Sequence, residues 1–333
     1  MLIANLYFIK NTNGLLYYSI DYLTKHRNSI KKILIRPFLY ETIKKEFPDT
    51  KIICCRNLLS LLKEIYIDAA KNFVYTPTPH PIPFINNQWV IVHDSYPFCG
   101  LIGSAKRLLL KFGLLTSQCR IGYINQTETF KFVQDLSSDN KRLIFAPNKV
   151  FEVDQPIRRN NNFISPIKVG LVGTDSPKKN YHHLIQSTEK LGLSANFKFL
   201  VYGHDTKYFQ KLIMSKQDSQ IFLERSDQIP INQYFNKIDI FISVAHNEGY
   251  GRPIAMALSL GIPCFLLNKP VFREFFNSAY FYDDIDSLIF SVNQFCCSDS
   301  RMIQKKYIPP LHIIEGFNNA NIELGLKSQT LIR

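Results

Sequence analysis

The feature that most constrains the fold is an alternation of short apolar runs with segments of helical periodicity. The strand-like runs lie at 2–9, 31–37, 51–55, 88–94, 120–125, 141–147, 167–173, 196–203, 220–224, 238–244 and 262–267. Segments that repeat apolar residues at helical spacing separate many of them. Strands that alternate with helices predict crossover units and parallel sheets. A chain of 333 residues exceeds the usual size of one core, so we expect two such domains.

The alternation stops between Pro147 and Pro166. This stretch holds several prolines, a run of asparagines and two adjacent arginines, which is typical of a linker. We therefore predict a first domain at 1–150, a linker at 151–166 and a second domain at 167–310. Residues 311–333 form a tail that could return to the first domain.

Charge and cysteine usage narrow the class of protein. The net charge of +13 suits nucleic acid, an anionic membrane surface or phosphate-bearing substrates. No zinc knuckle, RNP-like strand or basic heptad accompanies the charge, which argues against nucleic acid. No apolar run reaches the ~18 residues that a membrane helix requires. The seven cysteines lack metal-ligand spacing, which favours a reduced, cytoplasmic protein without a metal site.

One glycine-rich loop carries a glutamate. The sequence EGYGRP, Glu248–Pro253, follows a predicted strand and precedes a helix that ends near Gly261. The free N–H groups of a helix N-terminus attract anions, and glycine lets an anion approach them. A glutamate would repel phosphate but can bind a neutral sugar hydroxyl beside it. A tight turn for packing is the alternative.

A second loop places two lysines at the end of a strand. In GTDSPKKN, Gly173–Asn180, Lys178 and Lys179 stand in or just before the first turn of a predicted helix. Cations there are unfavourable for the helix dipole, which favours a functional reason for them. A lysine at the carboxyl end of a strand can neutralise a pyrophosphate, and ligands of open parallel sheets bind at that edge.

These loops together resemble the retaining glycosyltransferases of family 4, which have the GT-B fold. The motifs GTDSPKKN, FLVYG, EGYGRP and ALSLGIP occur in the family's order over about half of the chain. In the first half, WVIVHDSYPF, LIFAPNKVF and NTNGLL match more loosely. The resemblance implies two Rossmann-like parallel α/β domains that face each other across a cleft, with the acceptor domain first and the nucleotide-sugar donor domain second.

The resemblance also implies roles for single residues. Lys179, supported by Lys178, would bind the donor diphosphate, and Glu248 would bind hydroxyls of the donor sugar. His93 would face the transferred sugar from the first domain, so His93, Lys179 and Glu248 are the catalytic candidates. The remaining donor-binding candidates are Gly173, Thr174, Gly249, Tyr250, Gly251 and Arg252. Asn13 and Gly14 would lie close to the diphosphate or the acceptor.

The implied reaction moves a sugar from a UDP- or GDP-linked donor to a hydroxyl of a glycan, a glycolipid or a protein glycan, with retained configuration. Protein cations would stabilise the departing diphosphate without a metal or another cofactor. Such an enzyme would be cytoplasmic and could work at the membrane on lipid-linked acceptors, where a basic first domain would dock.

Departures from the family pattern leave alternative functions open. Met256 stands where the family has a second glutamate for the ribose, and Arg252 replaces a leucine-like residue. One alternative is a GT-B protein that binds a nucleotide sugar or glycan without turnover. Another is a basic protein that reuses the fold at a membrane surface or on nucleic acid. His93 could also be a hydrogen-bonded core residue, and Arg252 a solvated charge.

Overall fold

The computed structural model describes residues 1–12, 14–117, 119–137, 139–150, 165–214, 220–246, 248–297 and 307–330. The candidate Asn13 and most of the predicted linker, 151–164, lie outside the described residues. The chain divides into two compact units, which we describe separately. The first comprises Met1–Lys149 and Pro310–Arg333, and the second comprises Val150–Pro309.

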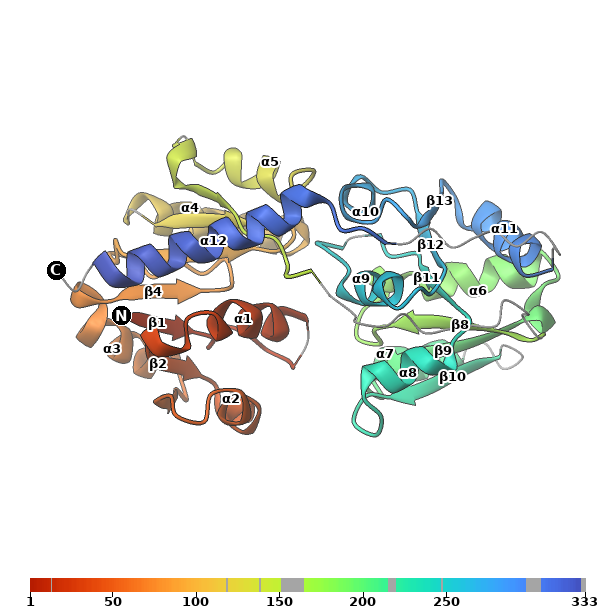
Figure 1. The fold of residues 1–333 in the computed structure, drawn as a ribbon, viewed down its shortest axis with the longest axis horizontal. Coiled ribbons are helices and arrows are strands. Elements are labelled where there is room, and N and C mark those ends of the chain that lie inside the picture. The colour runs from red at the N-terminus through yellow and green to blue at the C-terminus, as the bar shows by residue number, and fades with distance from the viewer. Residues whose placement is uncertain are drawn as a thin grey trace. The chain divides into compact units, whose positions relative to one another are not determined.

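Strands and helices alternate along both units (Figure 1). The first unit contains β1 (Leu2–Asn5), α1 (Gly14–Thr24), β2 (Ile30–Ile35), α2 (Tyr40–Glu46), β3 (Ile52–Cys54), α3 (Leu58–Asp68), β4 (Phe73–Thr76), β5 (Gln88–Val92), α4 (Gly100–Leu115), β6 (Arg120–Tyr123), α5 (Thr129–Gln134), β7 (Leu143–Phe145) and α12 (Leu311–Thr330). The second contains β8 (Ile167–Val172), α6 (Tyr181–Lys190), β9 (Phe197–Gly203), α7 (Lys207–Met214), β10 (Ile221–Arg225), α8 (Ile231–Lys237), β11 (Ile240–Ser243), α9 (Arg252–Ser259), β12 (Cys264–Leu267), α10 (Pro270–Phe275), β13 (Tyr280–Tyr282) and α11 (Ile285–Cys297).

Both sheets have the same doubly wound strand order. The first sheet runs β3-β2-β1-β4-β5-β6-β7 and the second runs β10-β9-β8-β11-β12-β13, and all of these strand pairs are parallel. The order reverses between β1 and β4 in the first sheet and between β8 and β11 in the second. The loops that leave such neighbouring strands diverge to opposite faces, which opens a binding crevice at their carboxyl ends.

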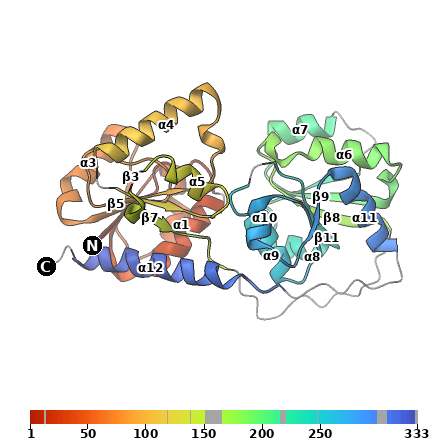
Figure 2. The same ribbon diagram turned by 90° about the horizontal axis from the view of Figure 1, so that it is seen from above.

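Helices cover both faces of each sheet. Figure 2 shows α3 and α4 on one side of the first sheet and α1 and α12 on the other. It also shows α6 and α7 across the second sheet from α8 and α9. All residues of β1, β4, β5 and β12 are buried, as expected for parallel strands that are covered on both faces.

The C-terminal helix α12 packs in the first unit. The rings of Phe317 and Tyr22 lie 4.8 Å apart, and Glu323 forms an ion pair with Arg120. Gly316 allows close approach to β7, because a Cβ atom there would lie 2.5 Å from Cδ1 of Phe145. Aromatic packing thus joins α12 to helix α1, and an ion pair joins it to strand β6.

We expect the docking of α12 to weaken in mild acid. His26 Nε2 lies 3.2 Å from Oδ1 of Asn321, whose own amide group donates to the carbonyl of Phe317. Burial lowers the pKa of His26 from its ordinary value of 6.5, although the bond to Asn321 opposes this. The unfolded chain therefore binds the proton more readily, so the free energy of unfolding falls as pH drops through 6.5. Between about pH 7 and 5, the melting temperature of a His26→Gln variant should fall less than that of the wild type. Equal decreases would contradict the role of His26 in this pH dependence.

Candidate active site

The two loops singled out in the sequence follow neighbouring strands of the second sheet. Lys179 lies in the loop after β8 and Glu248 in the loop after β11, and these strands flank the reversal of strand order. The backbone N–H of His246 also donates to the carbonyl of Lys178 at 3.0 Å, which ties the two loops together. The candidate site therefore occupies the position where doubly wound sheets bind ligands.

The loop after β8 is shaped by a glycine and a left-handed asparagine. Gly173 has φ +105°, and a Cβ atom there would lie 2.7 Å from Cε of Lys179. The predicted lysine pair stands in a short 3-10 turn, Pro177–Lys179, which Ser176 caps by accepting from the N–H of Lys178. Asn180, at φ 60°, then turns the chain into α6. Glycine at position 173 thus permits the positive φ of the turn and leaves room for the Lys179 side chain.

The loop after β11 ends at the N-terminus of α9. Gly251 has φ +90° and precedes the first residue of the helix, and Pro253 stands in the first turn. Proline is suited to the first turn of a helix. A backbone N–H there has no acceptor within the helix, so proline, which lacks this N–H, costs no hydrogen bond. The remaining N–H groups of the first turn give this end of the helix a partial positive charge.

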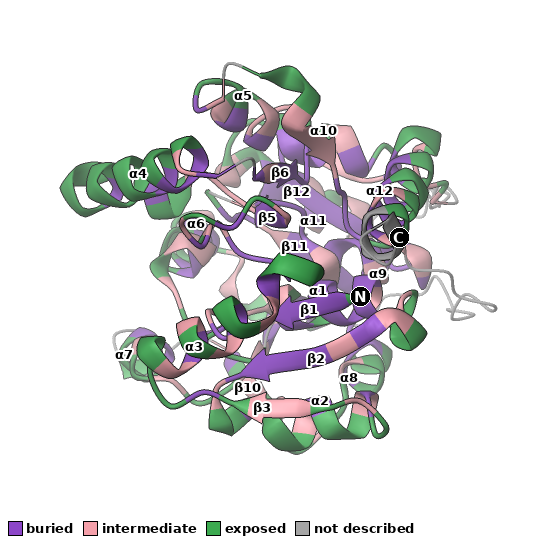
Figure 3. Cartoon of the chain, turned by 90° about the vertical axis from the view of Figure 1, so that its left-hand side faces the viewer, coloured by how far each residue is buried: buried purple, intermediate pink, exposed green. Residues whose placement is uncertain are grey.

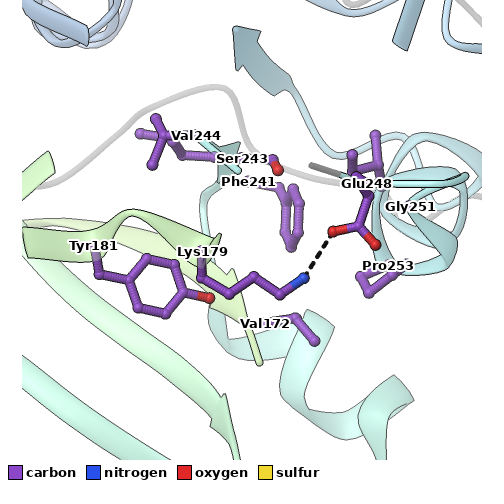
Figure 4. Close-up of a pocket in the computed structure, with 11 residues that line it drawn as sticks. Val172, Lys179, Tyr181, Phe241, Ser243, Val244, Glu248, Gly251 and Pro253 are labelled. Atoms are coloured by element: carbon purple, nitrogen blue, oxygen red, sulfur yellow. Dashed lines mark hydrogen bonds and ion pairs between the residues drawn. The ribbon is translucent and has the colours of Figure 1, made fainter. Parts of the chain in front are cut away.

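An ion pair joins the two loops. Lys179 Nζ lies 2.9 Å from Oε2 of Glu248, and the side chains are 17% and 19% exposed. Figure 4 shows the ammonium group pointing at the carboxylate across the pocket. Burial alone would raise the pKa of Glu248, but the charges of Lys179 and Lys178 outweigh it and lower that pKa. Glu248 is therefore ionised at neutral pH, and a cation and an anion meet in one partly enclosed place.

A pocket surrounds this ion pair. Its apolar lining consists of Val172, Phe241, Ile242, Val244, Pro253 and Ile254. Tyr181 and Ser243 also line it, and the sequence analysis did not single them out. Tyr181 is the first residue of α6 and Ser243 the last residue of β11. The sequence did contain a signal for Ser243, because it is a polar residue at the carboxyl end of a strand and ligands bind at that edge of the sheet.

The structure gives other donor candidates different surroundings. Thr174 is buried, and its hydroxyl donates to the carbonyl of His204 at 2.7 Å. Tyr250 is buried as well, with its ring 4.7 Å from that of Phe275. Arg252 is the half-buried first residue of α9. Thr174 and Tyr250 thus hold the two loops in shape, and their backbone remains the part suited to a ligand.

Gly249, the residue after Glu248, is buried. The candidates of the first unit belong to its own strand ends. His93 directly follows β5, and its Nε2 lies 3.0 Å from the carbonyl oxygen of Pro77, beyond β4. The ring also meets Tyr18 edge to face at 4.5 Å. Gly14 is the exposed first residue of α1. His93 is therefore a well-held, half-buried histidine one strand away from the reversal in the first sheet.

Gly251→Ala is expected to destabilise the second unit and to abolish ligand binding at the pocket. The left-handed backbone of an alanine costs about 1–3 kcal/mol, and its Cβ would lie 2.7 Å from Cδ1 of Ile254. The matched control is Gly192→Ala, which has φ +67° but no atom within 4 Å of its Cβ. Both variants should melt earlier, and the Gly251 variant alone should lose nucleotide binding in a calorimetric titration. Intact binding by the Gly251 variant would contradict the assignment of this loop.

Among the residues that the structure describes, no group of three or more His, Cys, Asp or Glu side chains is gathered as metal ligands would be. No helix in the described part of the chain is long and apolar enough to cross a membrane.

Comparisons with known proteins agree with this geometry. Residues 154–293, which contain both loops, match the family model described as Glycosyl transferases group 1. The chain is 26% identical over 223 residues to the O-antigen chain mannosyltransferase RfbU of Salmonella typhimurium. That alignment covers 63% of this chain and 60% of the length of the Salmonella protein.

Solved structures match over nearly the whole chain. Sucrose-phosphate synthase from Thermosynechococcus elongatus superposes with a TM-score of 0.70 at 11% identity and covers 100% of this chain and 99% of its own. WaaG, a glycosyltransferase involved in lipopolysaccharide biosynthesis, has a TM-score of 0.64 at 12% identity, with 98% and 95% covered. The predicted fold class is thereby confirmed: the chain consists of two Rossmann-like parallel α/β domains of the GT-B fold, and residues 154–293 match the glycosyl transferases group 1 model.

Proposed function

We propose that this protein is a retaining glycosyltransferase of the family 4 type, which moves a sugar from a nucleoside-diphosphate sugar to a hydroxyl acceptor. The observation that carries the proposal is the pair of Lys179 and Glu248, 2.9 Å apart at the strand reversal of the second sheet. The N-terminus of α9 begins beside it. The cation and the helix N-terminus can bind a diphosphate, and the carboxylate can accept a hydrogen bond from a sugar hydroxyl.

Without donor, the two charges neutralise each other. When a donor binds, Lys179 transfers its hydrogen bond from Glu248 to the diphosphate, with Lys178 in support. The carboxylate of Glu248 is then able to accept hydrogen bonds from sugar hydroxyls. As the bond to the sugar breaks, negative charge grows on the diphosphate, and Lys179 and the N–H groups of α9 stabilise it. The acceptor oxygen bonds to the anomeric carbon on the face that the diphosphate leaves, and the leaving phosphate takes the acceptor's proton, so the configuration is retained.

We assign the acceptor to the first unit. His93, held by the Pro77 carbonyl and the ring of Tyr18, would contact the transferred sugar. Gly14 would border the diphosphate or the acceptor, together with Asn13. The similarity to a mannosyltransferase makes GDP-mannose the first donor to test, followed by UDP-linked sugars. A glycan or lipid-linked glycan is the acceptor class that these relatives support.

We place the protein in the cytoplasm, at the periphery of a membrane. Six cysteines, at positions 54, 55, 99, 119, 264 and 296, are thiols outside any disulfide, which supports a reducing compartment. The net charge of +13 supports work near anionic lipid.

One observation favours a second candidate, a GT-B protein that binds a nucleotide sugar without turnover. Met256, half-buried on α9, stands where family members carry a ribose-binding glutamate. Release of nucleoside diphosphate from GDP- and UDP-sugars separates the two candidates. Release that falls in a Lys179→Ala variant supports the enzyme. Donor binding without release supports the second candidate, and absence of both binding and release rejects the proposed site.

A further inference from the structure

Helix α4 exposes an unusual number of large apolar side chains. It spans 16 residues in the first unit, and Figure 3 shows it exposed along most of its length. Leu101 is 93% exposed, Ile102 76% and Leu115 77%. Further exposed apolar side chains on the same helix are Leu108, Leu109 and Phe112. Scattered exposed leucines are ordinary, but six large apolar residues on one helix form a contiguous patch.

The exposed apolar residues share one side of the helix, away from its buried face. The buried face consists of Gly103, Leu110, Gly113 and Leu114. Gly103 packs closely, because a Cβ atom there would lie 2.2 Å from the carbonyl carbon of Phe98. At about 100° per residue, the six apolar side chains fall on an arc roughly opposite this face. They therefore point away from the sheet and toward solvent.

Basic residues border this apolar arc on both sides, and α4 contains no aspartate or glutamate. By the same helical spacing, Lys106 and Lys111 each lie about 40° beyond one edge of the arc, and Arg107 lies further round, beside the buried Leu114. Arg107 is engaged within the unit: it lies 3.7 Å from a carboxylate oxygen of Asp135 and 5.4 Å from the ring centre of Phe132. Lys106 and Lys111 are exposed.

We propose that α4 docks the protein on an anionic lipid surface by lying in the membrane interface. The apolar arc would enter the boundary between headgroups and acyl chains, and Lys106 and Lys111 would meet lipid phosphates. Charge complementarity favours lipid over a second copy of the chain, because two copies joined through α4 would bring these basic edges together. The inference rests on α4 alone and does not depend on the donor site.

Vesicle flotation tests the proposal. The wild type should float with phosphatidylcholine vesicles that contain phosphatidylglycerol, and much less with phosphatidylcholine alone. The variant Leu101→Ser/Leu108→Ser/Leu115→Ser should partition at least about tenfold less, because it removes three of the six apolar side chains that would enter the membrane. The variant Lys106→Gln/Lys111→Gln should bind less and lose most of the salt dependence. The matched control is Leu59→Ser/Ile67→Ser on α3, which removes two similarly exposed apolar residues and should bind like the wild type.

A reporter keeps the test independent of the serine variants. The natural tryptophan, Trp89, is buried, so Phe112→Trp adds a single exposed one. The emission of this variant should shift to the blue with anionic vesicles and be quenched by brominated lipid. The proposal is overturned if neither vesicle binds the wild type, if the triple serine variant binds as well as the wild type, or if the emission of the Phe112→Trp variant is unchanged. It is also overturned if α4 mediates self-association, seen as a concentration-dependent dimer that the triple serine variant abolishes, in place of lipid binding.

Discussion

Lys179→Ala is expected to lower kcat/KM for sugar transfer by at least about 100-fold, since removal of one preorganised group that stabilises a developing charge costs about 3–4 kcal/mol. Lys179 is the cation that faces the pocket, and its ammonium group lies 2.9 Å from Glu248. Initial rates of nucleotide release over a range of donor concentrations measure the effect. Most of the loss should fall on kcat, because the charge on the diphosphate grows in the transition state.

Lys178→Ala is the matched control for this variant. It removes the same charge from the neighbouring position, and the backbone carbonyl of Lys178, which accepts from the N–H of His246, is unchanged. We expect a loss of about tenfold or less, as for a peripheral charge. Equal losses in the two variants would mean that general positive charge, rather than the aimed ammonium group of Lys179, supports the reaction.

The lysines should also control the titration of Glu248. Their charges hold its pKa below the ordinary value against the effect of burial. In the wild type, this contribution to stability is present above the ordinary pKa of 4.5 and is lost as pH falls through the lowered pKa. In Lys178→Ala/Lys179→Ala, burial is left to raise the pKa. The double variant should then gain stability as pH falls through the raised pKa toward 4.5, and a melting curve with the wild-type pH dependence would contradict this.

Glu248→Ala is the second substitution with a large expected effect. The loss of a charged hydrogen-bond acceptor costs about 1.5–3 kcal/mol, which corresponds to a roughly 10- to 100-fold lower kcat/KM. Glu248→Gln keeps an acceptor of the same length and removes the charge, so its loss should be smaller. The comparison of the two variants on one donor series measures the role of the carboxylate. If alanine and glutamine reduce activity equally, a charge role would replace the proposed contact with sugar hydroxyls.

Much of the fold was predictable, because its signals are local. Short buried strands and amphipathic helices leave their period in the sequence, and both parallel sheets were expected from it. The helix stops were predictable too: Gly192 and Gly261 have φ +67° and +76° and follow α6 and α9. Glycine marks these points because the left-handed backbone there is costly for other residues.

Helix α4 was not predicted, and its packing explains why. A helix on a sheet normally marks its buried face with large apolar residues. Here the buried face contains Gly103 and Gly113, while Leu101, Leu108 and Leu115 are exposed. The apolar pattern therefore does not distinguish the face that packs from the face that does not.

Within the candidate site, the loops were predictable but their partners were not. Glycines, lysines and a glutamate at strand ends are visible in the sequence. The direct contact between Lys179 and Glu248 joins residues 69 positions apart, so it depends on the reversal of strand order. The inward packing of Thr174 and Tyr250 likewise depends on His204 and Phe275, which other elements supply.

The most direct test of the central claim is a thermal-shift titration of the wild type and of Lys178→Ala/Lys179→Ala with GDP, UDP and ADP. A ligand that binds only the folded protein raises the melting temperature by mass action. The donor site at the strand reversal predicts a shift with one nucleotide, and none with that nucleotide in the double variant. A shift of equal size in both proteins, or no shift with any of the three nucleotides, would contradict it.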